Sequence, residues 1–107
     1  MAEIINVVGA EAFNEALKLD KPVLVDFWAT WCMPCMKQGP ILHDLQEEMG
    51  DAVQVVKVDV DVNEALCRKY GVISIPMLAV FKNGEMVEKS VGLTTKSQLS
   101  EMILKHV

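Results

Sequence analysis

The sequence feature that constrains this chain most is a pair of cysteines, Cys32 and Cys35, separated by two residues. The pair follows a continuous apolar run, residues 23–29, which is typical of a buried β-strand. It precedes residues 33–49, where apolar side chains recur with helical spacing. The N-terminus of a helix presents unpaired N–H groups and a positive dipole end, so a thiolate at Cys32 is favoured there. Because the two sulfur atoms can also close a small disulfide ring, the motif predicts thiol–disulfide exchange.

Apolar periodicity along the rest of the chain predicts an α/β fold. Besides residues 23–28, strands are expected at residues 3–8, 53–60, 77–81 and 86–91. Helices are expected after Gly9, at residues 33–49, at residues 63–70 and from Thr95 onward. The order is therefore β-α-β-α-β-α-β-β-α. Strands joined through helices should be parallel, and the last two, joined by Asn-Gly, should form an antiparallel hairpin. We expect a central mixed five-stranded sheet flanked by four helices, with the site beyond the carboxyl end of a central strand.

Local signals refine the helix boundaries. Asp20-Lys21-Pro22 is expected to end the first helix. Pro40 interrupts the long helix and predicts a kink. Asn63 stands where an N-cap is expected, and Thr95 with Gln98 matches a capping box before the last helix.

Composition describes an ordinary folded domain and disfavours several kinds of partner. The chain has 107 residues and is 51% hydrophobic, so we expect a single domain spanning residues 1–107. Its net charge of -5 disfavours nucleic acid and anionic membrane, because both require clustered lysine and arginine. Its 3 cysteines do not form a disulfide framework, and neither a membrane-spanning run nor a secretory signal is visible. A cytoplasmic protein is expected, and a monomer, since no pattern indicates a dimer interface.

Asp26 is an unusual residue for the middle of an apolar run. A carboxylate on a strand buried on both faces loses its hydration, so its pKa should be raised. Such a group near Cys35 could accept the proton that Cys35 must lose before it attacks a disulfide. Lys57, on the strand expected beside it, could tune this carboxyl group. The alternative is that Asp26 and Lys57 form only a structural pair.

The chain resembles the thioredoxin family over nearly its whole length. The matching segments are residues 25–29, Trp31-Cys32-x-Pro34-Cys35, Pro40, residues 57–59, residues 70–72, Ile75-Pro76, residues 81–84 and Gly92. A lone Cys-x-x-Cys is a weak signal, whereas this motif followed by Ile-Pro and a Phe-Lys-Asn-Gly hairpin is specific. The resemblance implies a thioredoxin fold and a protein-disulfide oxidoreductase that is re-reduced by a thioredoxin reductase and acts on disulfide-containing target proteins.

The resemblance also assigns roles to individual residues. Cys32 is expected to be the nucleophile and the more exposed sulfur, and Cys35 the resolving thiol, with Asp26 and Lys57 acting as described above. The residues expected to bind substrate are Trp31, Met33, Pro34, Ile75, Pro76 and Gly92. Pro76 is expected to be cis, which would leave the Ile75 backbone free to pair with an extended target segment. Trp28 and Pro40 are expected to be structural residues near the site, although Trp28 could equally contact substrate.

Three methionines depart from the family pattern. Met33, Met36 and Met77 stand where the family usually has glycine, lysine and threonine. We expect a softer thioether rim that alters partner choice while exchange survives, with packing of Met36 against the helix as the alternative. Cys67 has no partner visible in the sequence, and a structural thiol is favoured over a regulatory one.

Other interpretations remain open on sequence alone. The cysteine pair is compatible with half of a zinc site, but only Cys67, His43 and His106 could complete it, at unsuitable spacings, so no metal is expected. No Gly-x-Gly-x-x-Gly follows a strand, so no flavin or nicotinamide cofactor is expected either. A noncatalytic interaction module, or a dedicated oxidant or isomerase, would use the same surface. Pro76 would also fit the start of an edge strand.

Overall fold

A computed structural model describes residues 3–107, in which five strands form one mixed sheet. The strands are β1 (Ile5–Val7), β2 (Val23–Trp28), β3 (Gln54–Asp59), β4 (Met77–Lys82) and β5 (Glu85–Val91), in the spatial order β1-β3-β2-β4-β5. Strands β1 and β2 both run parallel to β3, while β4 is antiparallel to β2 and to β5. This topology confirms the predicted mixed sheet and places β2 between β3 and β4, at its centre.

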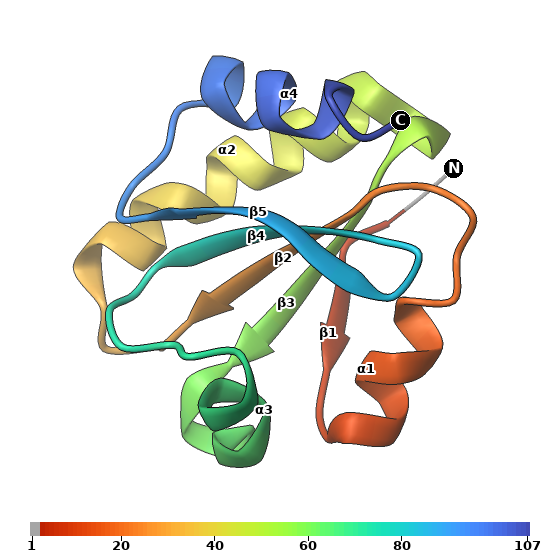
Figure 1. The fold of residues 1–107 in the computed structure, drawn as a ribbon. Helices are drawn as coiled ribbons and strands as arrows, with labels where there is room; N and C mark the ends of the chain where they lie inside the picture. Colours follow the sequence, from red (N-terminus) through yellow and green to blue (C-terminus); the bar gives the residue numbers. More distant parts are fainter. Residues whose placement is uncertain (1–2) are drawn as a thin grey trace.

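Four helices cover the two faces of this sheet. They are α1 (Ala10–Ala16), α2 (Met33–Met49), α3 (Glu64–Lys69) and α4 (Lys96–Leu104), and 3-10 turns follow α2 at Gly50–Ala52 and β3 at Val60–Val62. Figure 1 shows α2 and α4 on one face and α1 and α3 on the other. The predicted order of elements is therefore confirmed. None of the helices described in residues 3–107 is long and apolar enough to cross a membrane.

The alternation of β2 builds a separate apolar layer on each face. Val25 and Phe27 are fully buried in a cluster with Phe13 of α1 and Leu66 of α3. The opposite face of β2 contributes Leu24 to a second cluster, which includes the following residues of α2 and α4: Leu42, Leu45, Leu99, Met102 and Ile103. Burial on both faces explains why the β2 sequence is continuously apolar rather than alternating.

Several local predictions are confirmed and others are corrected. The capping box is present, with the Thr95 side chain accepting from the Gln98 N–H and the Gln98 side chain accepting from the Thr95 N–H. The hairpin turn has positive φ at Asn83 (55°) and Gly84 (81°), as two-residue turns of this kind require. Helix α2 continues through Pro40 without a break, and a kink there stays a prediction.

The first helix and the third helix differ from expectation at their ends. Helix α1 ends at Ala16, several residues before Asp20, and Leu17 is its C-cap. Asn63 precedes α3 as predicted, but its side chain makes no capping bond to that helix. It accepts from the Gly9 N–H at 2.8 Å and donates to the carbonyl oxygens of Val7 and Asp59. Asn63 therefore joins the β1–α1 junction to the end of β3, and these bonds satisfy its buried amide.

Candidate redox site

The cysteine pair lies where β2 passes into α2. Cys32 is the N-cap of α2, and its own N–H donates to the carbonyl of Ala29 at 3.2 Å, which closes the turn after the strand. Pro34 lies in the first turn, where its missing N–H leaves no carbonyl unpaired. Cys32 and Cys35 form a disulfide with their Cα atoms 5.2 Å apart. The two sulfurs are thus on one turn of helix, as the sequence predicts.

The helix N-terminus directs a backbone donor at the first sulfur. The N–H of Cys35 donates to Sγ of Cys32 at 3.2 Å. The same N–H can stabilise a Cys32 thiolate when the pair is reduced, because charge-assisted bonds of this kind favour the anion.

The two sulfurs differ in their access to solvent. Cys32 is 6% exposed and Cys35 is 0% exposed, so the first residue keeps a little exposed surface and the second keeps none. Both pack with Ala29 and with the half-buried side chains of Trp28 and Ile75. The order of exposure agrees with the roles predicted for the two cysteines.

Asp26 lies on β2, the strand that leads to the cysteine pair, and has no exposed surface. Neither of its carboxylate oxygens has a hydrogen-bond partner within residues 3–107. Burial raises the pKa of Asp26 from 3.8 to about 7, and the charge of Lys57, its register partner on β3, lowers it to a smaller degree. The ammonium group of Lys57 lies 4.2 Å from the centre of the Trp28 ring. Lys57 therefore interacts with Trp28 by a cation–π contact and with Asp26 through its field rather than through a hydrogen bond.

The segment before β4 forms the other side of the site. The Ile75–Pro76 peptide bond is cis, as the resemblance implies, and Pro76 is buried. The carbonyl oxygen of Ile75 lies 3.9 Å from Sγ of Cys32. The N–H of Gly92, at the end of β5, donates to the Pro76 carbonyl at 2.7 Å. Gly92 has a φ of 94°, and a Cβ there would meet nothing within 4 Å, so its conformation rather than a close neighbour explains the glycine.

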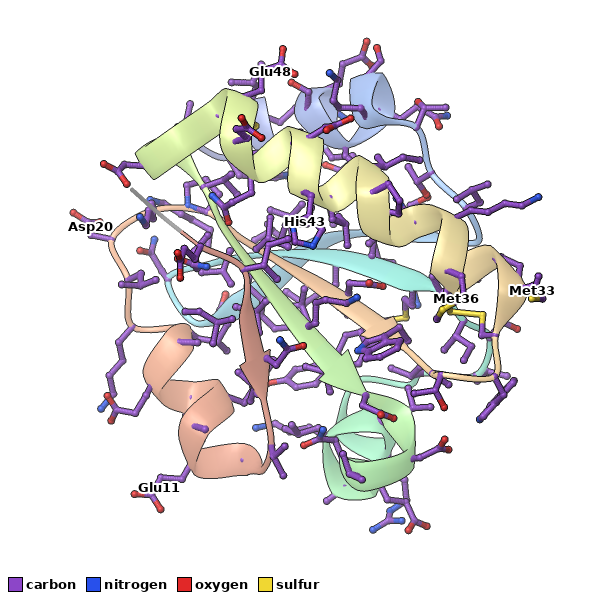
Figure 2. The ribbon with its side chains drawn as sticks, turned by 180° about the vertical axis from the view of Figure 1, so that it is seen from behind. Glu11, Asp20, Met33, Met36, His43 and Glu48 are labelled. Carbon is purple, nitrogen blue, oxygen red and sulfur yellow. A yellow bond between two sulfur atoms is a disulfide. The ribbon has the colours of Figure 1, made fainter. Side chains whose placement is uncertain are left out.

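Exposed apolar side chains surround the pair. Trp31 is 67% exposed, yet its indole N–H donates to Asp61 Oδ2 at 2.9 Å, which fixes the orientation of the ring. Met33 is 70% exposed and Met36 is 42% exposed, and Figure 2 shows both on the N-terminal part of α2. The alternative that Met36 packs against the helix stays a prediction, because more than half of this residue is covered. Pro34 is also exposed.

Met77 and Pro40 do not lie at the surface around the cysteines. Met77 is 1% exposed and belongs to the core cluster beneath α1 and α3, so it is not part of a thioether rim. The prediction that Met77 lines the surface around the cysteines is therefore wrong, because alternation along β4 turns its side chain into the core. Pro40 is exposed on α2, more than one turn beyond Cys35.

Cys67 has the properties of a structural thiol. Its half-buried side chain packs against the core cluster beneath α1 and α3. Burial raises the pKa of Cys67, and the carboxylates of Asp59, Asp61 and Glu64 raise it further. A thiol that stays protonated is a poor nucleophile and a poor metal ligand. Within residues 3–107, no three histidine, cysteine, aspartate or glutamate side chains are grouped so as to hold a metal ion.

Two residues of this region were not predicted from the sequence. Gln38 is fully buried on α2, and its amide bonds to the backbone of Thr94. Asp61 orients Trp31, and its own N–H donates to Asp59 Oδ1 at 2.9 Å. A polar residue within the buried stripe of α2 is a signal that could have identified Gln38. Nothing in the local sequence marks Asp61 as a partner of a residue 30 positions away.

Comparison with known proteins decides the family. The family model described as Thioredoxin matches residues 4–105. The chain belongs to the thioredoxin family. The thioredoxin of Bacillus subtilis (strain 168) is 53% identical over 85 residues, covering 79% of this chain and 82% of that protein. The thioredoxin of Haemophilus influenzae (strain ATCC 51907 / DSM 11121 / KW20 / Rd) is 39% identical over 107 residues, with 100% of both chains covered.

Solved structures agree with this membership. A mutant thioredoxin from Halobacterium salinarum NRC-1 has a TM-score of 0.91 and 36% identity, covering 97% of this chain and 90% of that one. The resemblance and the thioredoxin fold predicted from the sequence are thereby confirmed. As a member of the thioredoxin family, the chain is a disulfide oxidoreductase whose redox pair is Cys32 and Cys35.

Proposed function

We propose that this thioredoxin-family protein reduces disulfides in other proteins, with Cys32 as nucleophile and Cys35 as resolving thiol. In the first step, the Cys32 thiolate attacks one sulfur of a target disulfide. A Cys32–target disulfide forms, the target S–S bond breaks, and the other target sulfur leaves as a thiolate. The observation that supports this assignment is the difference between the two residues at the start of α2, since Cys32 is slightly exposed and accepts the Cys35 N–H, whereas Cys35 is fully buried.

The second step resolves the mixed disulfide. Cys35 gives up its proton and attacks Sγ of Cys32, so the Cys32–Cys35 disulfide forms and the second target thiolate leaves. Two electrons have then passed from the protein to the target. We assign Asp26 as the proton acceptor, because a carboxyl group with a pKa of about 7 is partly ionised at neutral pH and has no competing hydrogen bond within residues 3–107. Lys57 adjusts that pKa downward through its charge.

Target binding is assigned to the surface around Cys32. The Ile75 backbone, 3.9 Å from the sulfur, is proposed to pair with an extended target segment. Contacts with apolar side chains of the target are assigned to Trp31 and Met33, which are both more than half exposed. Pro34, Pro76 and Gly92 shape the backbone of this surface. The oxidised protein is proposed to be recharged by a thioredoxin reductase, and the chain itself supplies no further cofactor.

Insulin reduction tests this function and separates the two cysteines. The wild type should reduce insulin with a dithiol as electron source, and Cys32→Ser should not. Cys35→Ser should accumulate a covalent protein–insulin mixed disulfide through Cys32, visible by mass spectrometry. Cys67→Ser is the matched control and should behave as the wild type, because that thiol takes no part in exchange.

Two results would contradict the proposal. Trapping of insulin on residue 35 in Cys32→Ser, with none on residue 32 in Cys35→Ser, would reverse the roles. A partner that binds equally well to the Cys32→Ser/Cys35→Ser double variant, together with no insulin reduction by the wild type, would indicate an interaction module instead.

A further inference from the structure

Gln38 is a buried polar residue whose placement the chemistry above does not explain. It lies one turn beyond Cys35 on α2 and is 0% exposed. Its Oε1 accepts from the Thr94 N–H at 2.9 Å, and its Nε2 donates to the Thr94 carbonyl oxygen at 2.9 Å. Because Thr94 presents one donor and one acceptor, only one orientation of the amide satisfies both groups. The two bonds join the redox helix to the loop between β5 and α4.

That loop is in turn fastened to the segment containing the cis-proline. Thr94 is 3% exposed, and its hydroxyl donates to the Gly92 carbonyl at 2.9 Å and lies 2.9 Å from the Ser90 hydroxyl. The Gly92 N–H donates to the Pro76 carbonyl at 2.7 Å. Residues 92–94 therefore have fixed partners on two sides, α2 and the start of β4.

These bonds link the three segments that surround Cys32. The links run from α2 through Gln38 to the 92–94 loop, on to the segment before β4, and back to Cys32, whose Sγ is 3.9 Å from the Ile75 carbonyl. The outward side chains of this loop region are apolar, since Val91 is 55% exposed and Leu93 is 49% exposed. The buried amide of Gln38 thus holds in place the 92–94 loop, which is part of the surface on which a target would lie.

We propose that Gln38 is a positioning residue for target docking: it holds the 92–94 loop in a fixed place relative to Cys32. This inference rests on the proposed function and adds to it a residue that sets affinity for protein targets. A small disulfide needs only the sulfur of Cys32, whereas a polypeptide must also meet the loop. Loss of the Gln38 bonds should therefore affect protein targets more than small ones, because a preorganised surface lowers the cost of ordering on binding.

The chain offers a matched control on the same helix. Gln46 is also buried, at 3% exposed, and also bonds to backbone groups. Its amide donates to the carbonyls of Gly50 and Val53 and accepts from the Val55 N–H, at the end of α2 remote from the cysteines. Replacing either glutamine by methionine keeps the length of the side chain and removes its polar atoms. Both changes cost stability, but only the change at residue 38 touches the 92–94 loop.

The experiment compares reduction of insulin with reduction of 5,5′-dithiobis(2-nitrobenzoate) by wild type, Gln38→Met and Gln46→Met. For Gln38→Met we expect the KM for insulin to rise about fivefold to tenfold, as loss of two buried bonds predicts, with a much smaller change in the small-disulfide rate. Gln46→Met, which removes three such bonds, should lower the melting temperature at least as much and leave the insulin KM at the wild-type value. Equal effects of the two substitutions on the insulin KM, or an equal loss with both substrates in Gln38→Met, would overturn the inference.

Gln38→Glu provides a second test, which remains available if Gln38→Met does not fold. A neutral glutamic acid presents the same donor and acceptor to Thr94, whereas its ionised form can only accept. For Gln38→Glu we measure the rate with insulin relative to the rate with the small disulfide, and compare this ratio with that of the wild type at the same pH. The two ratios should be nearly equal at low pH, and the ratio of the variant should fall below that of the wild type as pH rises. A ratio that stays at the wild-type value at a pH where the new carboxyl group is ionised, as infrared difference spectroscopy reports, overturns the inference. Failure of the wild type to reduce insulin at all would instead refute the proposed function.

Discussion

At the scale of single residues, Asp26 shows how burial converts an ordinary carboxyl group into one that titrates near neutral pH. Its pKa is raised from 3.8 to about 7, chiefly by desolvation. Between pH about 4 and pH about 7 the folded protein keeps a proton that the unfolded chain has lost. Stability of the wild type should therefore fall as pH rises through this window and level off above it. The proton-accepting role proposed for Asp26 would therefore be maintained at the expense of stability.

Replacing Asp26 by asparagine should remove this pH dependence. The gain in unfolding free energy over the wild type should increase from pH about 4 to pH about 7, by up to roughly 4 kcal/mol. Urea unfolding at several pH values measures it, and the same substitution at an exposed position, Asp51→Asn, is the control for loss of a surface carboxyl group. Insulin reduction by Asp26→Asn should also slow. A difference from the wild type that is constant across this window would show that Asp26 ionises in the folded protein as it does in the unfolded chain.

Exposure also separates the methionines. Met33 and Met36 are 70% and 42% exposed, whereas Met77 and Met102 are 1% and 6% exposed. Dilute hydrogen peroxide, applied to the disulfide form, should therefore convert Met33 and Met36 to sulfoxides before Met77 and Met102. Because a sulfoxide is polar, insulin reduction should then decrease, and the Met33→Leu/Met36→Leu variant should be protected. Peptide mass spectrometry gives the order of oxidation, and earlier oxidation of Met77 would contradict the core position assigned to it.

At the scale of elements, helix α4 begins with a reciprocal cap. Thr95 accepts from the Gln98 N–H at 3.1 Å, and the Gln98 side chain accepts from the Thr95 N–H at 3.1 Å. Thr95→Ala should lower the free energy of unfolding by about 1 kcal/mol, as loss of an N-cap usually does. Ser97→Ala, at an exposed position of the same first turn, should have little effect, and chemical denaturation compares the two. Equal losses in both variants would mean that the cap contributes nothing specific.

The same scale shows what could be read from the sequence. The order of elements along the chain, the Asn83–Gly84 hairpin and the Thr95 capping box follow from local periodicity and turn chemistry, and all were predictable. The bonds of Gln38 and Asn63 were not, because their partners lie up to 56 residues away and their identity depends on how the layers pack. A polar residue within an apolar stripe indicates that a partner exists, and only tertiary structure reveals which one.

At the scale of the whole molecule, the single sheet contributes side chains to two apolar layers, one on each face. The buried apolar side chains of β2 and β4 alternate between the cluster under α2 and α4 and the cluster under α1 and α3. The redox pair lies at one end of this sheet, with Trp28 and Trp31 beside it. Because the layers share their strands, neither can come apart without exposing the other, so the domain should unfold as one unit.

Matched core substitutions in the two layers test this coupling. Leu42→Ala empties space under α2, and Leu66→Ala empties space under α3, since both side chains are at most 4% exposed. Each should cost about 2–5 kcal/mol, whereas Leu104→Ala, which is 56% exposed, should cost far less. In every variant, unfolding followed by circular dichroism and by fluorescence of the tryptophans beside the redox pair should coincide. In Leu66→Ala, a circular dichroism transition at lower denaturant with an unchanged tryptophan midpoint would show that the layers unfold independently. The shared strands would then keep the redox end folded without α3.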